Sequence, residues 1–268
     1  MASAPAASNA ARCLTLARPL KEVDINVRPA LALVAVTVAL TATATAQAVL
    51  DGSLDAGGHP AAGALLVPGP NGLATECSGV LVSPRVFVTA GHCTNFAIAN
   101  GGAYVVFGDQ LQPDTWNPIH GTAFTDPAYG HDSANPHDLG VVLLDNDAPV
   151  TPASLPAAGA ADRLARDGVA PVSVGYGYSL RQANKDFVYD GARHAGSIPV
   201  VSQTSTLLRL DGSGAHLCFG DSGGPQYLPN SNVVVSVTSG GSPSCRGAST
   251  ATRLDSASSR AFLAPYLN

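Results

Sequence analysis

Three observations predict an all-β fold for this 268-residue chain. The sequence contains 28 glycines and 20 prolines, the residues that most often mark turns. Short runs rich in the β-branched residues Val and Thr lie between them, and such runs favour strands. Hydrophobic residues make up 46% of the chain and charged residues only 12%, which is enough apolar material for a sizeable core. We therefore expect many short strands joined by turns.

The first 48 residues have the pattern of an export signal. Residues 29–50 contain no charge, and the segment before them carries Arg12, Arg18, Lys21 and Arg28 against Glu22 and Asp24. A small-x-small cleavage motif, Ala46-Gln47-Ala48, closes the pattern. We expect a leader over residues 1–48 and a secreted domain over 49–268. The alternative is an uncleaved membrane anchor, since 22 uncharged residues are long enough to span a bilayer.

Cysteine usage also fits an exported protein. Cys13 lies in the expected leader, which leaves an even number of cysteines for an oxidising compartment: Cys77, Cys93, Cys218 and Cys245. Their spacing fits neither a CxxC redox pair nor a zinc ribbon. Of the three connectivities that four cysteines allow, we expect Cys77–Cys93 and Cys218–Cys245, because each closes a local loop.

A glycine-rich stretch, CFGDSGGP at residues 218–225, surrounds one serine. Gly220, Gly223 and Gly224 permit a tight turn in which main-chain N–H groups converge. If Ser222 attacks a carbonyl group, the N–H groups of Gly220 and Ser222 can bind the oxygen that becomes negative. The plainer alternative is a flexible surface loop, and a serine hydroxyl needs a base elsewhere in the chain to become a nucleophile.

The candidate base lies in CSGVLVSPRVFVTAGHC, residues 77–93. Two apolar runs, 79–82 and 86–89, are separated by Ser-Pro-Arg and predict a β-hairpin. His92 follows the second strand, and a disulfide at its neighbour would fix the turn that presents the imidazole. Histidine is well suited to accept and return a proton near neutral pH. The alternative is an ordinary core or surface histidine.

An aspartate at the mouth of a strand completes the set. Asp138 precedes the apolar run Leu139–Leu144, which predicts a strand buried on both faces. A carboxylate in that place is costly unless it is paired, and an imidazole N–H would satisfy it. The alternative is a turn aspartate after Asn-Pro-His.

Three segments in this order, TAGHC, HDLGVVLL and CFGDSGGP, resemble the signature segments of the chymotrypsin/trypsin-type serine endopeptidases. The resemblance covers about residues 49–268, and the few disulfides and compact loops resemble secreted bacterial members. It implies two antiparallel six-stranded Greek-key β-barrels with a short C-terminal helix. The first barrel is expected over about 49–155, the second over about 156–255 and the helix over about 256–268.

The resemblance also implies roles for the residues already singled out. His92 would be the general base, Asp138 would orient it, Ser222 would attack, and the Gly220 and Ser222 amides would bind the oxyanion. In the same family a new N-terminus folds inward and pairs with the aspartate beside the nucleophile. This implies an ion pair between Val49 and Asp221, with export itself maturing the enzyme.

Substrate contacts follow from the same resemblance. The pocket floor would be His216 and Leu217, with Gly241 and Ser249 as walls, and the edge formed by Ser239, Gly240 and Gly241 would pair with an extended peptide. The floor carries no aspartate, so Lys or Arg is not the expected preference. We expect a small or medium apolar side chain, with an acidic one held by His216 as the alternative.

Charge and chemistry limit the other partners. A formal net charge of −5 and the absence of a basic run argue against nucleic acid and, after leader cleavage, against a membrane surface. Acyl-enzyme chemistry needs no cofactor. No calcium loop is expected, because Asp109 and Asp114 are the only carboxylates of the 108–122 link. We expect a monomer. The remaining alternatives are a binding module that keeps the fold without catalysis, and an esterase without peptide cleavage.

Overall fold

The computed structural model describes residues 49–132, 134–180 and 187–267. These residues are mostly strand, as the composition predicts. The strands are β1 (Ser53–Leu54), β2 (Ala62–Gly69), β3 (Gly72–Ser83), β4 (Val86–Thr89), β5 (Ala103–Phe107), β6 (Ile119–Thr125), β7 (Gly140–Leu144), β8 (Val172–Gly175), β9 (Ser179–Leu180), β10 (Phe187–Val188), β11 (His194–Ser197), β12 (Val200–Gln203), β13 (Leu207–Leu210), β14 (Pro225–Tyr227), β15 (Val234–Gly240) and β16 (Ser249–Arg253). The helices are α1 (Gly91–Ala99) and α2 (Ala257–Leu263), and short 3₁₀ turns span Pro113–Thr115 and Ala264–Tyr266.

The first sheet is a closed six-stranded barrel, as expected. Its strands follow the order β2-β3-β4-β7-β6-β5, and neighbouring strands are antiparallel. The hairpin expected around Ser83-Pro84-Arg85 is the β3–β4 connection. Leu65, Val80, Phe87 and Val141 are fully buried in the apolar core. Their burial accounts for the β-branched and apolar runs that predicted these strands.

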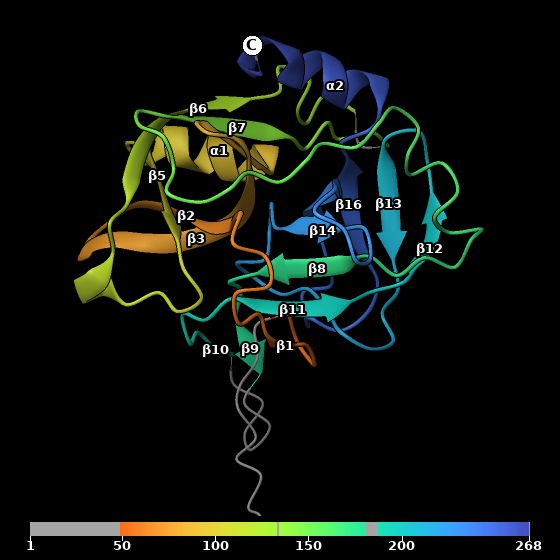
Figure 1. The fold of residues 1–268 in the computed structure, drawn as a ribbon, viewed down its shortest axis with the longest axis horizontal. Coiled ribbons are helices and arrows are strands. Elements are labelled where there is room, and N and C mark those ends of the chain that lie inside the picture. The colour runs from red at the N-terminus through yellow and green to blue at the C-terminus, as the bar shows by residue number, and fades with distance from the viewer. Residues whose placement is uncertain (1–48, 133, 181–186, 268) are drawn as a thin grey trace, which may run out of the picture. The chain divides into compact units, whose positions relative to one another are not determined.

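The second sheet differs in detail from the expected closed barrel. It contains eight antiparallel strands in the open order β1-β11-β8-β14-β15-β16-β13-β12, so it forms a curled half-barrel. The two-residue strand β1 adds to the edge at β11, far from its neighbours in sequence. Figure 1 shows this sheet beside the first barrel, with α2 close to β6, whose residues line one pocket together with residues of α2. The all-β class, the two sheet domains and the C-terminal helix are confirmed.

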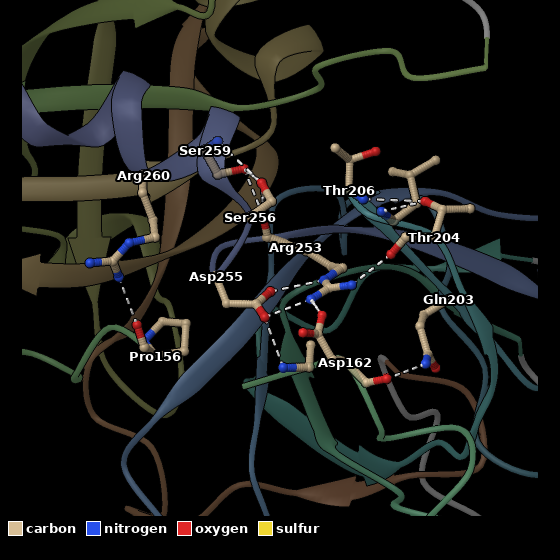
Figure 2. A network of polar contacts seen from close by, with 12 residues as sticks. Pro156, Asp162, Gln203, Thr204, Thr206, Arg253, Asp255, Ser256, Ser259 and Arg260 are labelled. Carbon is tan, nitrogen blue, oxygen red and sulfur yellow. Dashed lines mark hydrogen bonds and ion pairs between the residues drawn. The ribbon is translucent and has the colours of Figure 1, made fainter. Parts of the chain in front are cut away.

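A charged network centred on the buried pair Arg253 and Asp255 fixes the end of β16 (Figure 2). Arg253 forms ion pairs with Asp255 and Asp162, and its Nη1 donates to the Thr204 carbonyl oxygen at 2.6 Å. Asp255 also accepts a hydrogen bond from the Ala161 N–H at 2.8 Å. Buried charges are tolerated when they are paired and hydrogen-bonded in this way. The network therefore holds two loops against the last strand.

The C-terminal helix is short for a sequence reason. Ser256 is its N-cap, and the Ser256 hydroxyl oxygen accepts a hydrogen bond from the Ser259 N–H. The α-helix ends at Leu263, two residues before Pro265, as proline in a helix interior predicts. Leu263 is buried in the core cluster that extends from the first barrel, so the helix is anchored by one apolar side.

The expected leader, residues 1–48, lies outside the described residues. Within the described part, neither helix has the length and apolarity that crossing a bilayer requires.

Candidate active site

Strand pairing in the first barrel places His92 next to Asp138. β4 and β7 are antiparallel, and Thr89 pairs with Gly140 at the end of both strands. The chain leaves β4 directly into α1, where His92 is the second residue, and Asp138 lies two residues before β7 begins. Both side chains therefore lie at the same end of the barrel. The helix at His92 was not predicted from the sequence.

Asp138 contacts His92 through both carboxylate oxygens. Oδ1 accepts the His92 main-chain N–H at 2.8 Å, and Oδ2 lies 2.9 Å from the ring Nδ1. Oδ2 also accepts a hydrogen bond from the Ser239 hydroxyl at 2.6 Å. The Asp138 side chain is 5% exposed, whereas that of His92 is 34% exposed. The arrangement fixes the imidazole on one side and leaves its other nitrogen accessible.

The charge of Asp138 is maintained despite its burial. Burial on its own would raise the pKa of this carboxyl. Hydrogen bonds and charge attraction from His92, with a hydrogen bond from Ser239, outweigh that effect and hold the pKa of Asp138 below its usual value. An ionised Asp138 favours the tautomer in which His92 Nδ1 carries the proton, which leaves Nε2 free to accept one.

In the loop of Ser222, every main-chain carbonyl of residues 218–222 accepts a hydrogen bond. The donors to the carbonyls of residues 218, 219, 220, 221 and 222 are, respectively, the Asp221 N–H (3.1 Å), the Tyr178 N–H (2.7 Å), the Ser78 hydroxyl (2.8 Å), the Gly224 N–H (2.9 Å) and the Ser78 N–H (2.8 Å). In the described part of the chain, the Gly220 and Ser222 N–H groups donate to no residue. A trans peptide directs its C=O and N–H to opposite sides, so occupied carbonyls leave these two amides available.

The position of Ser222 depends on a close approach at Gly223. Gly223 has φ +76°, and a Cβ there would lie 2.0 Å from Thr89 Oγ1 and 2.5 Å from the Ser78 carbonyl oxygen. Only glycine allows the loop to approach β3 and β4 this closely. The loop thus meets the barrel end that carries His92. Among the described residues no hydrogen bond joins the Ser222 hydroxyl to His92, and such contacts are often long in unliganded enzymes.

The structure brings Val49 and Asp221 together. Both residues are fully buried, and the Val49 main-chain nitrogen donates a hydrogen bond to the Asp221 carboxylate. Gly177 and Cys218 also donate main-chain N–H groups to this carboxylate, each at 2.9 Å. Burial raises the pKa of Asp221 to about 6, although these main-chain donors counteract the shift. Because residue 48 precedes Val49 in the sequence, the Val49 donor is here a peptide N–H.

Of the residues expected to contact substrate, some line a cavity next to Ser222 and others do not. Ser222 opens onto a cavity of about 170 Å³, and the other residues that line it are Leu217, Cys218, Phe219, Thr238, Gly240, Gly241, Ser242 and Pro243. His216 and Ser249 were expected to contribute to the pocket but do not line this cavity. His216 is buried, pairs with Leu50 through the main chain, and has an Nδ1 atom with no hydrogen-bond partner among the described residues. Ser239 contacts Asp138 instead of lining the cavity.

Both disulfides have the expected connectivity. Cys77 is bonded to Cys93, and Cys218 is bonded to Cys245. The first joins β3 to the residue after His92. The second bridges the loop that leads to Ser222 and a segment next to the cavity. Each disulfide therefore braces one side of the candidate site.

Sequence reasoning missed Ser78. The prediction used the neighbouring cysteine but assigned no role to this serine, whose hydroxyl contacts the Tyr176 N–H and the Gly220 carbonyl, both outside its own sheet. These partners are 98 and 142 residues further along the chain, so no local sequence pattern predicts the contacts.

Comparisons with known proteins agree with this geometry. A family model described as "Trypsin" matches residues 53–259. Among solved structures, one described as HL collagenase superposes with a TM-score of 0.64 at 17% identity, covering 81% of this chain and 98% of its own. Neuropsin, described as a serine protease expressed in the limbic system of mouse brain, superposes with a TM-score of 0.63 at 20% identity, covering 82% of this chain and 100% of its own. At these identities the two structures show likeness of fold.

Proposed function

Because the chain belongs to the trypsin family of serine proteases, we propose that it is a secreted serine endopeptidase that cleaves peptide bonds through an acyl-enzyme on Ser222. The observation that carries the proposal is the combination of a His92–Asp138 pair with two unbonded amides beside Ser222. A general base and an oxyanion site are the two elements that turn a serine hydroxyl into an acylation catalyst.

In the proposed reaction, Ser222 Oγ attacks the scissile carbonyl carbon while its proton moves to His92 Nε2. The carbonyl oxygen becomes negative and is bound by the Gly220 and Ser222 N–H groups. His92 then gives its proton to the leaving amine as the C–N bond breaks, which leaves an ester on Ser222. Water attacks that ester while its proton moves to His92, and His92 returns this proton to Ser222 Oγ as the ester C–O bond breaks and the acid product departs. Asp138 stabilises the imidazolium that forms in each half-reaction.

The cavity beside Ser222 supports a preference for a small or medium apolar side chain. No charged side chain lines it, and Leu217 supplies an apolar wall. A lysine or arginine in this cavity would lack a carboxylate partner, and burying an unpaired charge is costly. Because His216 does not line the cavity, the alternative of an acidic side chain held by His216 loses its support.

The binding edge supports an extended peptide as substrate. Gly241 follows the end of β15, is exposed, and its main chain makes no hydrogen bond with another described residue. β15 lies between β14 and β16, but the chain beyond its end has no strand partner among the described residues. Unpaired main-chain groups of this kind accept an added strand, whose main chain gives affinity while one pocket gives selectivity. We propose that the substrate lies along this edge with its selected side chain in the cavity.

The Ser222→Ala variant and the wild-type protein test the proposal on casein and on matched peptide ester and amide substrates. Ser222→Ala is expected to remain folded and to lose turnover on the order of 10⁴-fold or more. The wild-type protein is expected to cleave the amide as well as the ester. Cleavage of the ester alone would identify an esterase. A folded wild-type protein that cleaves neither substrate would contradict the proposal and favour a binding module.

A further inference from the structure

Ser78 occupies the contact between the first barrel and the loop of Ser222. It lies on β3, is 1% exposed, and follows the cysteine that is bonded to Cys93. Its hydroxyl donates a hydrogen bond to the Gly220 carbonyl oxygen at 2.8 Å and accepts one from the Tyr176 N–H at 2.9 Å. Its main-chain N–H donates to the Ser222 carbonyl oxygen at 2.8 Å. One serine thus contacts the loop on both sides of Asp221.

The Gly220 carbonyl belongs to the peptide unit between the two unbonded amides. The unit before it is held by the Tyr178 N–H at the Phe219 carbonyl, and the unit after it by the Gly224 N–H at the Asp221 carbonyl. These two bonds direct the Gly220 and Ser222 N–H groups to the opposite side. The middle unit has two partners: the Ser78 hydroxyl donates to its carbonyl, and its Asp221 N–H donates to the Cys218 carbonyl oxygen at 3.1 Å. Without the Ser78 hydroxyl, the Gly220 carbonyl has no hydrogen-bond donor among the described residues.

Gly220 makes that middle unit easy to rotate. Its φ is +90°, and glycine reaches the conformations on either side of this value at little steric cost. A carbonyl that loses its hydrogen-bond donor in a buried site becomes more stable when it turns toward another donor or toward water. Rotation of the 220–221 peptide changes ψ of Gly220 and φ of Asp221 and also breaks the hydrogen bond from the Asp221 N–H to the Cys218 carbonyl oxygen, so the unit that fixes the Gly220 and Ser222 amides relative to one another is lost. The contact with Ser78 therefore opposes a loop conformation in which the amides no longer converge.

We propose that the Ser78 hydroxyl is a positioning residue that holds the oxyanion-binding conformation of the loop. The inference rests on the proposed function, because it assigns the Gly220 and Ser222 amides to the transition state. It predicts an effect on the chemical step, with little effect on substrate binding, because Ser78 is buried and does not line the cavity. Oxyanion contacts contribute in the transition state and much less in the ground state.

Three variants separate positioning from general packing. Ser78→Ala removes both hydroxyl contacts. Ser78→Thr retains the hydroxyl but adds a methyl group in a crowded place, so it costs stability while keeping the contacts. Ser173→Ala is the matched control: Ser173 is fully buried on β8 of the second sheet, and its hydroxyl has no hydrogen-bond partner among the described residues.

The measurements are kcat and KM on a peptide substrate, the second-order rate of phosphonylation by a fluorophosphonate, and the melting temperature. All rates are expressed per folded molecule. Phosphonylation places a phosphoryl oxygen where the oxyanion forms, so it reports on the loop without knowledge of the preferred side chain.

We expect Ser78→Ala to lose about 10- to 100-fold in kcat and in phosphonylation rate, which is less than the loss from deleting an oxyanion donor itself. KM should change less than threefold, and Ser173→Ala and Ser78→Thr should stay within about threefold of wild type in both rates.

Several results would overturn the inference. Equal rates for Ser78→Ala and Ser173→Ala would show that the hydroxyl has no role in the chemical step. A Ser78→Ala protein that cannot fold would assign the hydroxyl to folding rather than positioning. If the loss appeared in KM alone, or if Ser78→Thr lost as much rate as Ser78→Ala, the contacts of the hydroxyl would not be the cause. A folded wild-type protein with neither turnover nor phosphonylation would reject the proposed function, and this inference with it.

Discussion

Asp138 contacts His92 at two points, the main-chain N–H at 2.8 Å and the ring Nδ1 at 2.9 Å. The first contact fixes the helix start, and the second fixes the ring. Together they determine both the position and the tautomer of the imidazole. This is more constraint than one ion pair would supply, because rotation of the ring alone cannot relieve it.

The first prediction concerns that pair. Asp138→Asn places an amide NH₂ or a neutral oxygen opposite His92 Nδ1, so the tautomer with Nε2 free is no longer favoured. We expect kcat to fall on the order of 10⁴-fold with KM nearly unchanged. Asp126→Asn is the control, since Asp126 is also buried and lies in the same loop, where it accepts a hydrogen bond from the Ala128 N–H. A loss below tenfold for Asp138→Asn would contradict the assigned role.

The second prediction concerns the other donor to Asp138. Ser239→Ala removes the 2.6 Å hydrogen bond to Oδ2 and leaves one side of a buried carboxylate unsatisfied. Hydrogen bonds to charged groups are worth about 1.5–3 kcal/mol, so we expect kcat to fall about tenfold. Ser236→Ala on the same strand removes a buried bond to Gln226 and should lower the melting temperature without this loss. If the two variants have the same kcat, Ser239 does not support catalysis through Asp138.

The third prediction concerns the close approach at Gly223. A Cβ at this position meets main-chain atoms of Ser78 and Ala90 at 2.5 and 2.7 Å. Gly223→Ala should lower the free energy of unfolding by about 3 kcal/mol or more, from collision and from the positive φ. Gly130→Ala is the matched control, with the same φ of +76° and nothing within 4 Å. It should cost about 1–2 kcal/mol, the effect of φ alone. Equal losses in urea unfolding would show that contact at Gly223 is unimportant.

The fourth prediction concerns Asp221 and pH. With residue 48 attached, burial raises the folded pKa of Asp221 to about 6 from an ordinary 3.8. The folded chain then binds the proton on Asp221 more tightly than the unfolded chain does. The contribution of Asp221 to the free energy of unfolding therefore falls as pH rises from about 4 to 6. The loss is on the order of 3 kcal/mol. A chain that begins at Val49 places an ammonium there, which lowers the pKa of Asp221 and reverses the sign: stability is then lost as pH falls through the folded pKa.

Urea unfolding of both forms from pH 4 to 9 measures this difference, in a Ser222→Ala background that prevents self-digestion. The form that begins at Val49 should also lose stability above pH 8, as the raised pKa of its α-amino group is passed. Parallel pH profiles for the two forms would reject the Val49–Asp221 ion pair. N-terminal sequencing of the exported protein, with a start well after Val49, would reject it independently.

The parts of the fold that were predictable are those with local patterns. The apolar run after Asp138 and the hairpin before His92 announce β7, β3 and β4, and the short loops between cysteines favour the observed disulfides. Both a strand pattern and a reactive side chain next to it can be recognised in the sequence from the residue types alone.

The parts that escaped prediction depend on partners distant in sequence. Arg193 is 1% exposed and forms ion pairs with Asp55 and Asp109, at separations of 138 and 84 residues. Nothing in the sequence distinguishes this arginine from a surface one. The edge strand β1 and the open second sheet depend on the same kind of long-range pairing. His216 was placed by resemblance at the pocket floor, but its main chain pairs with Leu50, and it does not line the cavity.

The most direct measurement for the central claim is the intact mass of the disulfide-bonded protein before and after a fluorophosphonate, followed by peptide mapping. We predict one adduct per chain, located on Ser222 and absent from Ser222→Ala. The untreated mass also locates the N-terminus, expected at Val49. No adduct on a folded chain that begins at Val49 would contradict the proposal that His92, Asp138 and the loop amides activate this serine.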